Sequence, residues 1–184
     1  MQLIGDRISI LEKEKELSIV ILSYRHPFKN ILIISWMLLF TFCGVLAFRE
    51  FIGAVEHDRR IFWMVFIGFW VYFEVSVLKA CLWRWRGKEK ILMSPGILKI
   101  KREVSGLESY KEYRMEQTGN WKRIIPDNRS ISGFYENAYW FVGGERISFD
   151  FQGQEIGLGL QLKDEDVNEL VRKLKHSYRF FINT

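Results

Sequence analysis

Two long apolar stretches dominate the pattern of hydrophobic and polar positions along this chain. They cover residues 31–48 and 61–83, and only a dozen residues separate them. A helix needs about 20 predominantly apolar residues to cross the hydrocarbon core of a bilayer. The sequence therefore predicts a transmembrane helical hairpin over residues 27–85, with spans at about 28–49 and 60–83.

Strand-like alternation precedes the first apolar stretch. Apolar and polar residues alternate over 7–11 and 16–22, and the charged tetrad at 12–15 suits the tip of a β-hairpin. A two-stranded hairpin alone is marginally stable in water. Residues 1–24 are therefore expected to join a sheet formed by the soluble domain, residues 86–184, that follows the membrane hairpin.

The chain beyond the second stretch also alternates and predicts a run of antiparallel strands. The Ser-Pro-Gly sequence at 94–96 is typical of a turn between two strands. Residues 117–136 show no regular pattern and contain several turn residues. The strands are expected at 90–93, 97–102, 109–115, 138–142, 147–151 and 156–160.

After the last strand the apolar period changes from two to that of a helix. Asp164 is a plausible cap, and acids in the first turn suit the helix dipole. The predicted fold class is thus a membrane α-helical hairpin plus an α+β domain, an antiparallel β barrel or sandwich closed by a C-terminal helix. The apolar stripe of that helix consists of Val167, Leu170, Val171, Leu174 and Tyr178.

The distribution of basic residues indicates the topology. Bases gather before the first stretch and after the second, whereas the three arginines in residues 49–60 are offset by three acids. Lys and Arg accumulate on the cytoplasmic side of membrane proteins, so both termini and the soluble domain are expected in the cytoplasm. The bases that flank the spans either fix this topology or bind anionic lipid head groups; they are Arg25, Lys29, Arg84, Arg86 and Lys88.

Glu74 is the one acid within the apolar stretches and lies near the middle of its span. A carboxyl group at this depth costs a few kcal/mol and is expected to be protonated or partnered. Ser35 and Thr41 lie at matching depth on the first span. Three interpretations remain open: a neutral acid bonded to Thr41 within the hairpin, a polar contact to a partner subunit, and an ion or proton relay.

Aromatic residues are frequent in and beside the spans. Trp36, Trp63, Trp83 and Trp85 are interpreted as interfacial anchors or as packing residues of the hairpin. Lys99, Lys101 and Arg102 on a predicted strand suggest a basic face that binds lipid head groups.

The sequence offers little catalytic chemistry. His26, His57 and His176 lack the spacing of metal ligands, and no nucleophile–base grouping or phosphate-binding glycine loop is found. Cys43 and Cys81 are expected at opposite ends of an antiparallel hairpin, so free thiols are expected rather than a disulfide. The sequence therefore predicts a protein that is not an enzyme, with no cofactor, no metal and no nucleic-acid partner.

Several short segments resemble a known architecture. They are Gly-Lys-Glu at 87–89, ILKIKRE at 97–103, Lys-Glu-Tyr at 111–113, ISFDFQG at 147–153 and Gly-Leu-Gly at 157–159. Together with the closing helix, they resemble a family of small bacterial membrane proteins with two transmembrane helices and a pleckstrin-homology-like (PH-like) cytoplasmic domain. The resemblance implies a location in the bacterial inner (plasma) membrane. It implies no activity, since the family is largely without an assigned role.

The predicted membrane hairpin and soluble domain are compatible with three functions. The leading one is a non-enzymatic scaffold, accessory or assembly subunit that docks on a larger membrane protein complex. The second is a membrane module that senses anionic lipids, and the weakest is ion or proton transport. The expected partners are the lipid bilayer and either a membrane protein or further copies of this chain.

Overall fold

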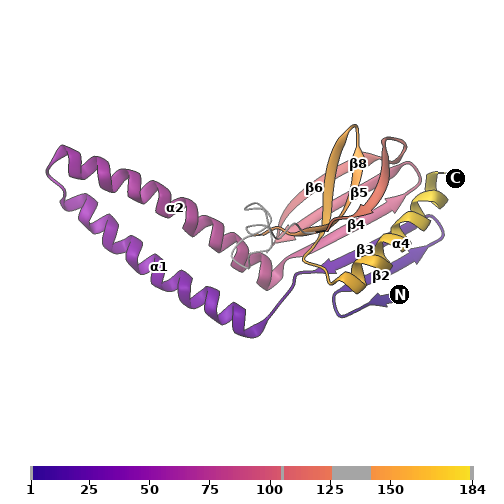
Figure 1. Ribbon diagram of the computed structural model, residues 1–184, viewed down its shortest axis with the longest axis horizontal. Coiled ribbons are helices and arrows are strands. Elements are labelled where there is room, and N and C mark those ends of the chain that lie inside the picture. The colour runs from indigo at the N-terminus through magenta and orange to yellow at the C-terminus, as the bar shows by residue number, and fades with distance from the viewer. Residues whose placement is uncertain (1, 105, 126–141, 183–184) are drawn as a thin grey trace.

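A helical hairpin projects from a β domain in the computed structural model of this chain (Figure 1). The structure describes residues 2–104, 106–125 and 142–182. Both ends of the chain lie on the β domain, on the side away from the hairpin (Figure 1).

The hairpin consists of α1 (Pro27–Gly53) and α2 (His57–Arg86). Each helix is long and apolar enough to cross a membrane, and only 17% and 6% of their most apolar stretches are buried. Apolar side chains exposed along both helices are typical of contact with lipid, because a core helix of a soluble protein is mostly buried. Most of the predicted polar turn at 49–60 is helical. Hydrophobicity marks only the apolar part of each helix, whereas helical hydrogen bonding continues into the polar residues beyond it.

Close packing between the two helices centres on a glycine. A Cβ atom on Gly44 would lie 2.0 Å from the ring of Trp70, so only glycine fits there without movement. The indole Nε1 of Trp70 donates a hydrogen bond to the carbonyl oxygen of Phe40 at 2.9 Å. Small residues at such contacts let membrane helices approach closely. Nearer the β domain, Ile33 packs with Val77 and Ala80.

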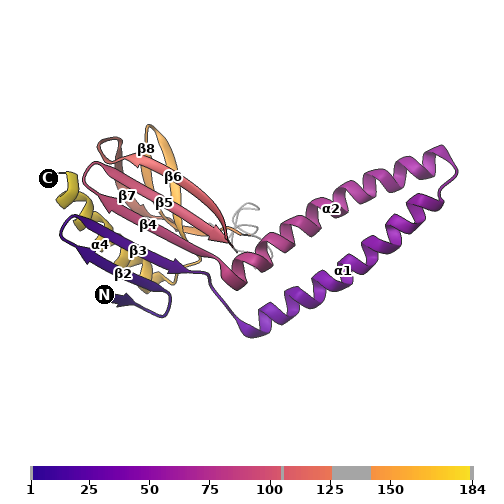
Figure 2. The same ribbon diagram turned by 180° about the vertical axis from the view of Figure 1, so that it is seen from behind.

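A six-stranded antiparallel sheet carries the hairpin as an insertion (Figure 2). β3 precedes α1, β4 follows α2, and the two strands pair from Leu17 opposite Met93 to Leu22 opposite Lys88. The N-terminal segment thus shares a sheet with the chain beyond the hairpin. The strands in spatial order are β1 (Gln2–Ile4), β2 (Ile8–Lys13), β3 (Glu16–Leu22), β4 (Lys88–Ser94), β5 (Ile97–Val104) and β6 (Leu107–Arg114).

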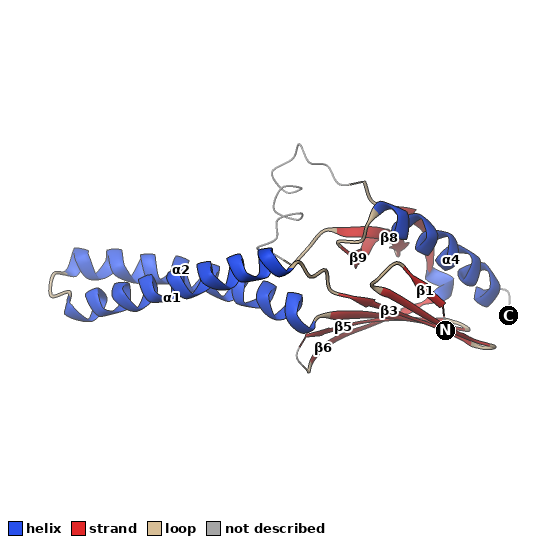
Figure 3. Ribbon diagram, turned by 90° about the horizontal axis from the view of Figure 1, so that it is seen from below, coloured by secondary structure: helices blue, strands red, loops and turns tan. Residues whose placement is uncertain are grey.

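A second antiparallel sheet of three strands lies in a separate layer, and helix α4 (Asp164–Ile182) lies away from the hairpin (Figure 3). The short 3-10 helix η1 (Met115–Gln117) connects β6 to the first strand of this sheet. One hydrophobic core joins both sheets to α4, which contributes Val167, Leu170, Leu174 and Phe181. The strands are β7 (Thr118–Arg123), β8 (Glu145–Phe151) and β9 (Gln154–Leu160).

β7 lies in the segment for which the sequence showed no regular pattern. Its pairing with β8 shifts register between Gly119 and Lys122, and such a bulge breaks the alternation by which strands are recognised. The strand predicted at 138–142 falls outside the described residues, except for Val142, which lies in a bend.

A buried ionic cluster connects the two sheets. The carboxylate of Glu89 in β4 is 1% exposed. Its Oε1 accepts a hydrogen bond from Arg102 Nε at 2.9 Å, and its Oε2 accepts one from the Gly159 backbone N–H at 2.7 Å. Arg102 also donates to the Gly157 carbonyl and to Glu145. Burial opposes the charge on Arg102, but Glu89 and Glu145 outweigh it and raise the Arg102 pKa.

Candidate functional site at the domain end of the hairpin

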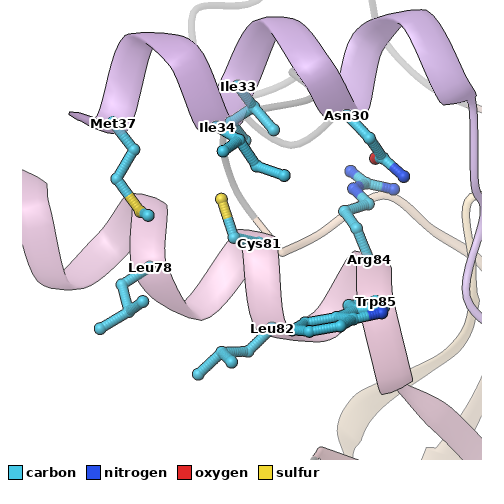
Figure 4. A pocket seen from close by; sticks show the side chains of 9 residues that line it. All are labelled: Asn30, Ile33, Ile34, Met37, Leu78, Cys81, Leu82, Arg84 and Trp85. Atoms are coloured by element: carbon cyan, nitrogen blue, oxygen red, sulfur yellow. The ribbon is translucent and has the colours of Figure 1, made fainter. Parts of the chain in front are cut away.

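A cavity of about 420 Å³ lies between α1 and α2 where the hairpin meets the β domain (Figure 4). Most of its wall is apolar, and its lining includes the polar residues Asn30 of α1 and Arg84 of α2. The nine lining residues are Asn30, Ile33, Ile34, Met37, Leu78, Cys81, Leu82, Arg84 and Trp85.

Short connections fix the helices at this end. Pro27 stands in the first turn of α1, where its missing N–H is tolerated, and His26 Nδ1 caps the N–H of Lys29. On the other helix, Gly87 alone separates α2 from β4, and a Cβ atom there would lie 2.5 Å from the ring of Trp83. Ser23, which follows β3, donates from its backbone N–H to the Gly87 carbonyl at 3.0 Å.

Arg84 is the least exposed base beside the spans. Its side chain is 1% exposed, and its guanidinium donates to the side-chain oxygen of Gln161, in the turn between β9 and α4. Its carbonyl accepts a hydrogen bond from the Ser23 hydroxyl at 3.1 Å. Arg84 is therefore held inside the protein at the junction, rather than at the surface with the other bases.

A second guanidinium lies near Arg84. Arg7 donates to the Leu22 carbonyl at 2.7 Å and to the Gln161 carbonyl at 2.7 Å. Burial lowers the pKa of Arg7 to about 10; the positive charge of Arg84 adds to this shift, and Asp166 partly opposes it. Two guanidinium groups therefore lie close together at the base of the hairpin, with the carboxylate of Asp166 also nearby.

The other predicted bases are placed differently. Arg25, Lys29 and Arg86 have exposed side chains. Lys88 forms an ion pair with Glu103 at 2.7 Å, and the same carboxylate contacts Lys90. These four residues lie near the surface. Their role in binding lipid head groups or in fixing the topology stays a prediction.

The basic face suggested on β5 is neutralised by the neighbouring strand. Lys99 pairs with Glu112 at 2.5 Å, and Lys101 pairs with Glu108 at 2.5 Å. The hydrogen bond from Lys99 lowers the pKa of Glu112, with a further contribution from Tyr110. This face alternates in charge and does not offer a continuous positive surface.

Glu74 bonds across the hairpin. Its Oε1 lies 2.5 Å from the hydroxyl of Thr41, which also lies 2.8 Å from the carbonyl of Met37. Ser35 has an exposed side chain and lies six residues, or about 9 Å along the helix axis, from Thr41. The structure thus brings Glu74 and Thr41 together and leaves Ser35 apart.

The four tryptophans that the sequence analysis interprets as anchors or packing residues occupy different environments. Trp36 is 38% exposed and stacks on Phe40 with ring centroids 4.7 Å apart, and Trp63 packs edge-on against Phe66. Trp83 is 5% exposed and packs at the junction, whereas Trp85 is 66% exposed and carries the guanidinium of Arg86 over its ring. Trp83 is therefore a packing residue, and Trp85 has the exposure that an interfacial anchor needs.

Sequence reasoning did not bring the residues of this region together. Trp70, Glu74, Val77, Cys81 and Arg84 recur at three- and four-residue spacing along one face of α2, and this signal would have grouped Arg84 with the hairpin contacts. Nothing local in the sequence relates Arg7 or Gln161 to Arg84, because these contacts join distant parts of the chain.

The described residues offer little for metal chemistry. Among them, no group of three His, Cys, Asp or Glu side chains could hold a metal ion. Both cysteines are free, with Cys43 exposed and Cys81 half-buried in the cavity wall. The site combines an apolar cavity with a buried guanidinium.

Comparisons with protein-family models, curated proteins and solved structures find no match for this chain.

Proposed function

We propose that this chain is a non-enzymatic accessory or assembly subunit of the bacterial inner membrane. Its two helices cross the bilayer, and its β domain and both termini lie in the cytoplasm, where they dock on a larger membrane protein complex. Two antiparallel sheets packed with a C-terminal helix support the further proposal that the β domain is PH-like.

The observation that carries this proposal is the stiff junction between hairpin and domain. β3 and β4 are paired neighbours in the sheet. Four residues join β3 to α1, and Gly87 alone joins α2 to β4. The Ser23 side chain and backbone bond to the end of α2 and to Gly87. A domain attached in this way keeps a fixed height and orientation at the membrane surface, which suits a subunit that presents a docking surface.

Ion or proton transport receives less support from the hairpin. Glu74 forms its hydrogen bond with Thr41, and the neighbouring polar contact, Trp70 to Phe40, is also internal to the hairpin. A relay needs a series of such groups along the membrane. Lys79, the other charged residue of the second apolar stretch, has an exposed side chain.

Copurification tests the proposal. The full chain, carrying a C-terminal tag and produced in its native host, would be extracted in mild detergent and analysed by cross-linking and mass spectrometry. A companion protein present at a constant ratio would support the proposal. Purification of the chain with cross-links only to itself would overturn it.

Two variants would locate the docking surface. Tyr110→Ser alters a side chain that is 52% exposed on the edge strand β6, and Phe69→Ala alters one that is 66% exposed on α2. Loss of the companion with only the first variant would assign docking to the β domain. Loss with only the second would assign it to the hairpin.

One observation favours a second candidate, an anionic-lipid module. Three of the bases beside the spans, Arg25, Lys29 and Arg86, have exposed side chains.

A further inference from the structure

We infer that the ends of β5 and β6 nearest the hairpin lie in the interfacial layer of the bilayer, where Leu107 contacts lipid. The partner of this surface is the membrane itself, at the boundary between head groups and acyl chains. The inference rests on the proposed crossing of the bilayer by α1 and α2. It needs no companion protein and holds for either side of the membrane.

A groove of about 530 Å³ lies between this end of the β domain and α2. Ser76, Lys79 and Leu82 line it from the helix, and Leu107 and Ser109 line it from β6. β5 also contacts α2, and the two elements lie side by side at the base of the hairpin (Figure 2). The end of β6 is therefore level with residues 76–82 of α2.

This part of α2 belongs to the stretch that is proposed to cross the bilayer. The apolar stretch at 61–83 is about 34 Å long as a helix, little more than the roughly 30 Å of the hydrocarbon core. Residues 76–82 thus lie at one edge of the core. Lys79 has an exposed side chain, and a lysine at this depth extends its ammonium group to the head groups. Leu107, which lines the same groove, is therefore placed at the interface.

The β domain presents exposed apolar side chains at this depth. Val104 at the end of β5 pairs with Leu107 at the start of β6. The side chain of Leu107 is 78% exposed, and that of Val142, which also lines the groove, is 42% exposed. Transfer of an apolar side chain from water to an apolar environment is favourable. Contact with lipid would therefore stabilise this end of the sheet against the membrane.

The acids next to this apolar end are paired within the domain. Glu103 forms an ion pair with Lys88 at 2.7 Å, and Glu108 forms one with Lys101 at 2.5 Å. Each carboxylate beside Leu107 therefore has a positive charge next to it, which reduces its repulsion of anionic head groups.

The rest of the edge strand has the composition of an edge in water. Lys111 and Arg114, farther along β6, have exposed side chains. Charged residues of this kind protect an edge strand from pairing with other chains. The change from charged to apolar residues falls where β6 approaches α2, which assigns the lipid contact to the Leu107 end of the strand.

Spin labelling of the purified full chain tests the inference in nanodiscs of phosphatidylglycerol and phosphatidylcholine. A background with Cys43→Ala and Cys81→Ala would carry a single nitroxide at Leu107→Cys. Leu3→Cys is the matched control, because Leu3 is also an exposed leucine, at 66%, and lies on the opposite edge strand of the same sheet. Phe69→Cys, at a side chain of α2 that is also 66% exposed, reports whether the hairpin crosses the bilayer.

The depth of each nitroxide follows from its collision rates with two reagents. Molecular oxygen is apolar and concentrates in lipid, whereas a nickel chelate is polar and stays in water. We expect the ratio of oxygen to nickel collisions at Leu107 to be at least about twofold higher than at Leu3, and lower than at Phe69. This order would place the Leu107 side chain between water and the hydrocarbon core.

Equal ratios at Leu107 and Leu3, together with a high ratio at Phe69, would overturn the inference and leave the transmembrane hairpin in place. A low ratio at Phe69 would overturn the membrane crossing and the inference together. Low collision rates of both reagents at Leu107 would mean that protein covers this side chain, and would also overturn the inference. The nanodiscs contain only this chain and lipid, so the result is separate from the copurification experiment.

Discussion

The hydroxyl oxygen of Thr41 lies 2.5 Å from Oε1 of Glu74, on the opposite helix of the hairpin. The same hydroxyl lies 2.8 Å from the carbonyl oxygen of Met37. A threonine hydroxyl has a single hydrogen and can donate it to only one of these oxygens. A protonated Glu74 would donate to Thr41 while Thr41 donates to Met37. We therefore expect a neutral acid that is bonded within the hairpin.

Replacing Glu74 with glutamine tests this assignment. Glutamine retains the shape and a donor, so we expect Glu74→Gln to unfold in detergent within a few degrees of the unsubstituted protein. Glu74→Ala and Thr41→Val each remove the bond and should cost about 0.6–1.7 kcal/mol, from the average to the largest value measured for hydrogen bonds between membrane helices. Thr41→Ser, which keeps the hydroxyl, is the control. Equal destabilisation by Glu74→Gln and Glu74→Ala would show that the carboxylate is charged.

Gly44 is expected to tolerate no side chain. A methyl group at this position would overlap the ring of Trp70, whereas a Cβ atom on Gly68 of α2 meets nothing within 4 Å. Gly44→Ala should therefore destabilise the hairpin by about 1–3 kcal/mol through overpacking. Gly68→Ala should be neutral or stabilising, because alanine favours helix. Thermal unfolding followed by tryptophan fluorescence measures both, and a stable Gly44→Ala protein would contradict the packing described.

The cluster around Glu89 should be essential to the β domain. Glu89→Ala leaves Arg102 without its closest carboxylate and the Gly159 N–H without its acceptor. We expect a loss of about 3–5 kcal/mol, as for other broken buried ion pairs. Glu108→Ala removes only a surface pair with Lys101 and should have no measurable effect on unfolding. Similar unfolding temperatures for the two variants would refute a structural role for the cluster.

Acidification should weaken the charged outer face of the six-stranded sheet. Hydrogen bonds from Lys88, and then Lys90, lower the pKa of Glu103 below its ordinary value of 4.5. The unfolded chain then binds more protons than the folded one in this range, so stability is present above pH 4.5 and is lost as the pH falls through the folded pKa.

Unfolding temperatures between about pH 3 and pH 7 check this expectation. The decline in stability below the ordinary pKa of 4.5 should be shallower for Glu103→Gln, which has no carboxyl group to titrate. Glu14→Gln, at an exposed position in the turn between β2 and β3, is the control. If the unfolding temperature of Glu103→Gln fell with acid as steeply as that of the unsubstituted protein, the ion pairs of Glu103 would add nothing to stability.

The fold was largely predictable because its signals are periodic. Uninterrupted apolar residues mark α1 and α2, alternation marks β2, β3, β8 and β9, and the apolar stripe from Val167 to Tyr178 marks α4. β1 has only three residues, too few to display a period. β7 carries a bulge, and the ends of α1 and α2 are polar, so hydrophobicity alone does not find them.

The candidate site was only partly predictable. The pairing of Glu74 with Thr41 follows from matching depth on two antiparallel helices. The burial of Arg84 does not, because a base at the end of a span resembles a topology signal, and its contact with Gln161 depends on how the β domain folds back on the hairpin. The cavity likewise depends on the distance between the two helices, which no local sequence pattern predicts.

The insertion of the hairpin between β3 and β4 has a consequence for biosynthesis. β1 to β3 are synthesised first, and β3 can pair with β4 only after both helices have left the ribosome. A chain that inserted one helix and not the other would leave the two strands in different compartments. Under the proposed topology, the sheet can therefore form only after both helices have been inserted in the bilayer.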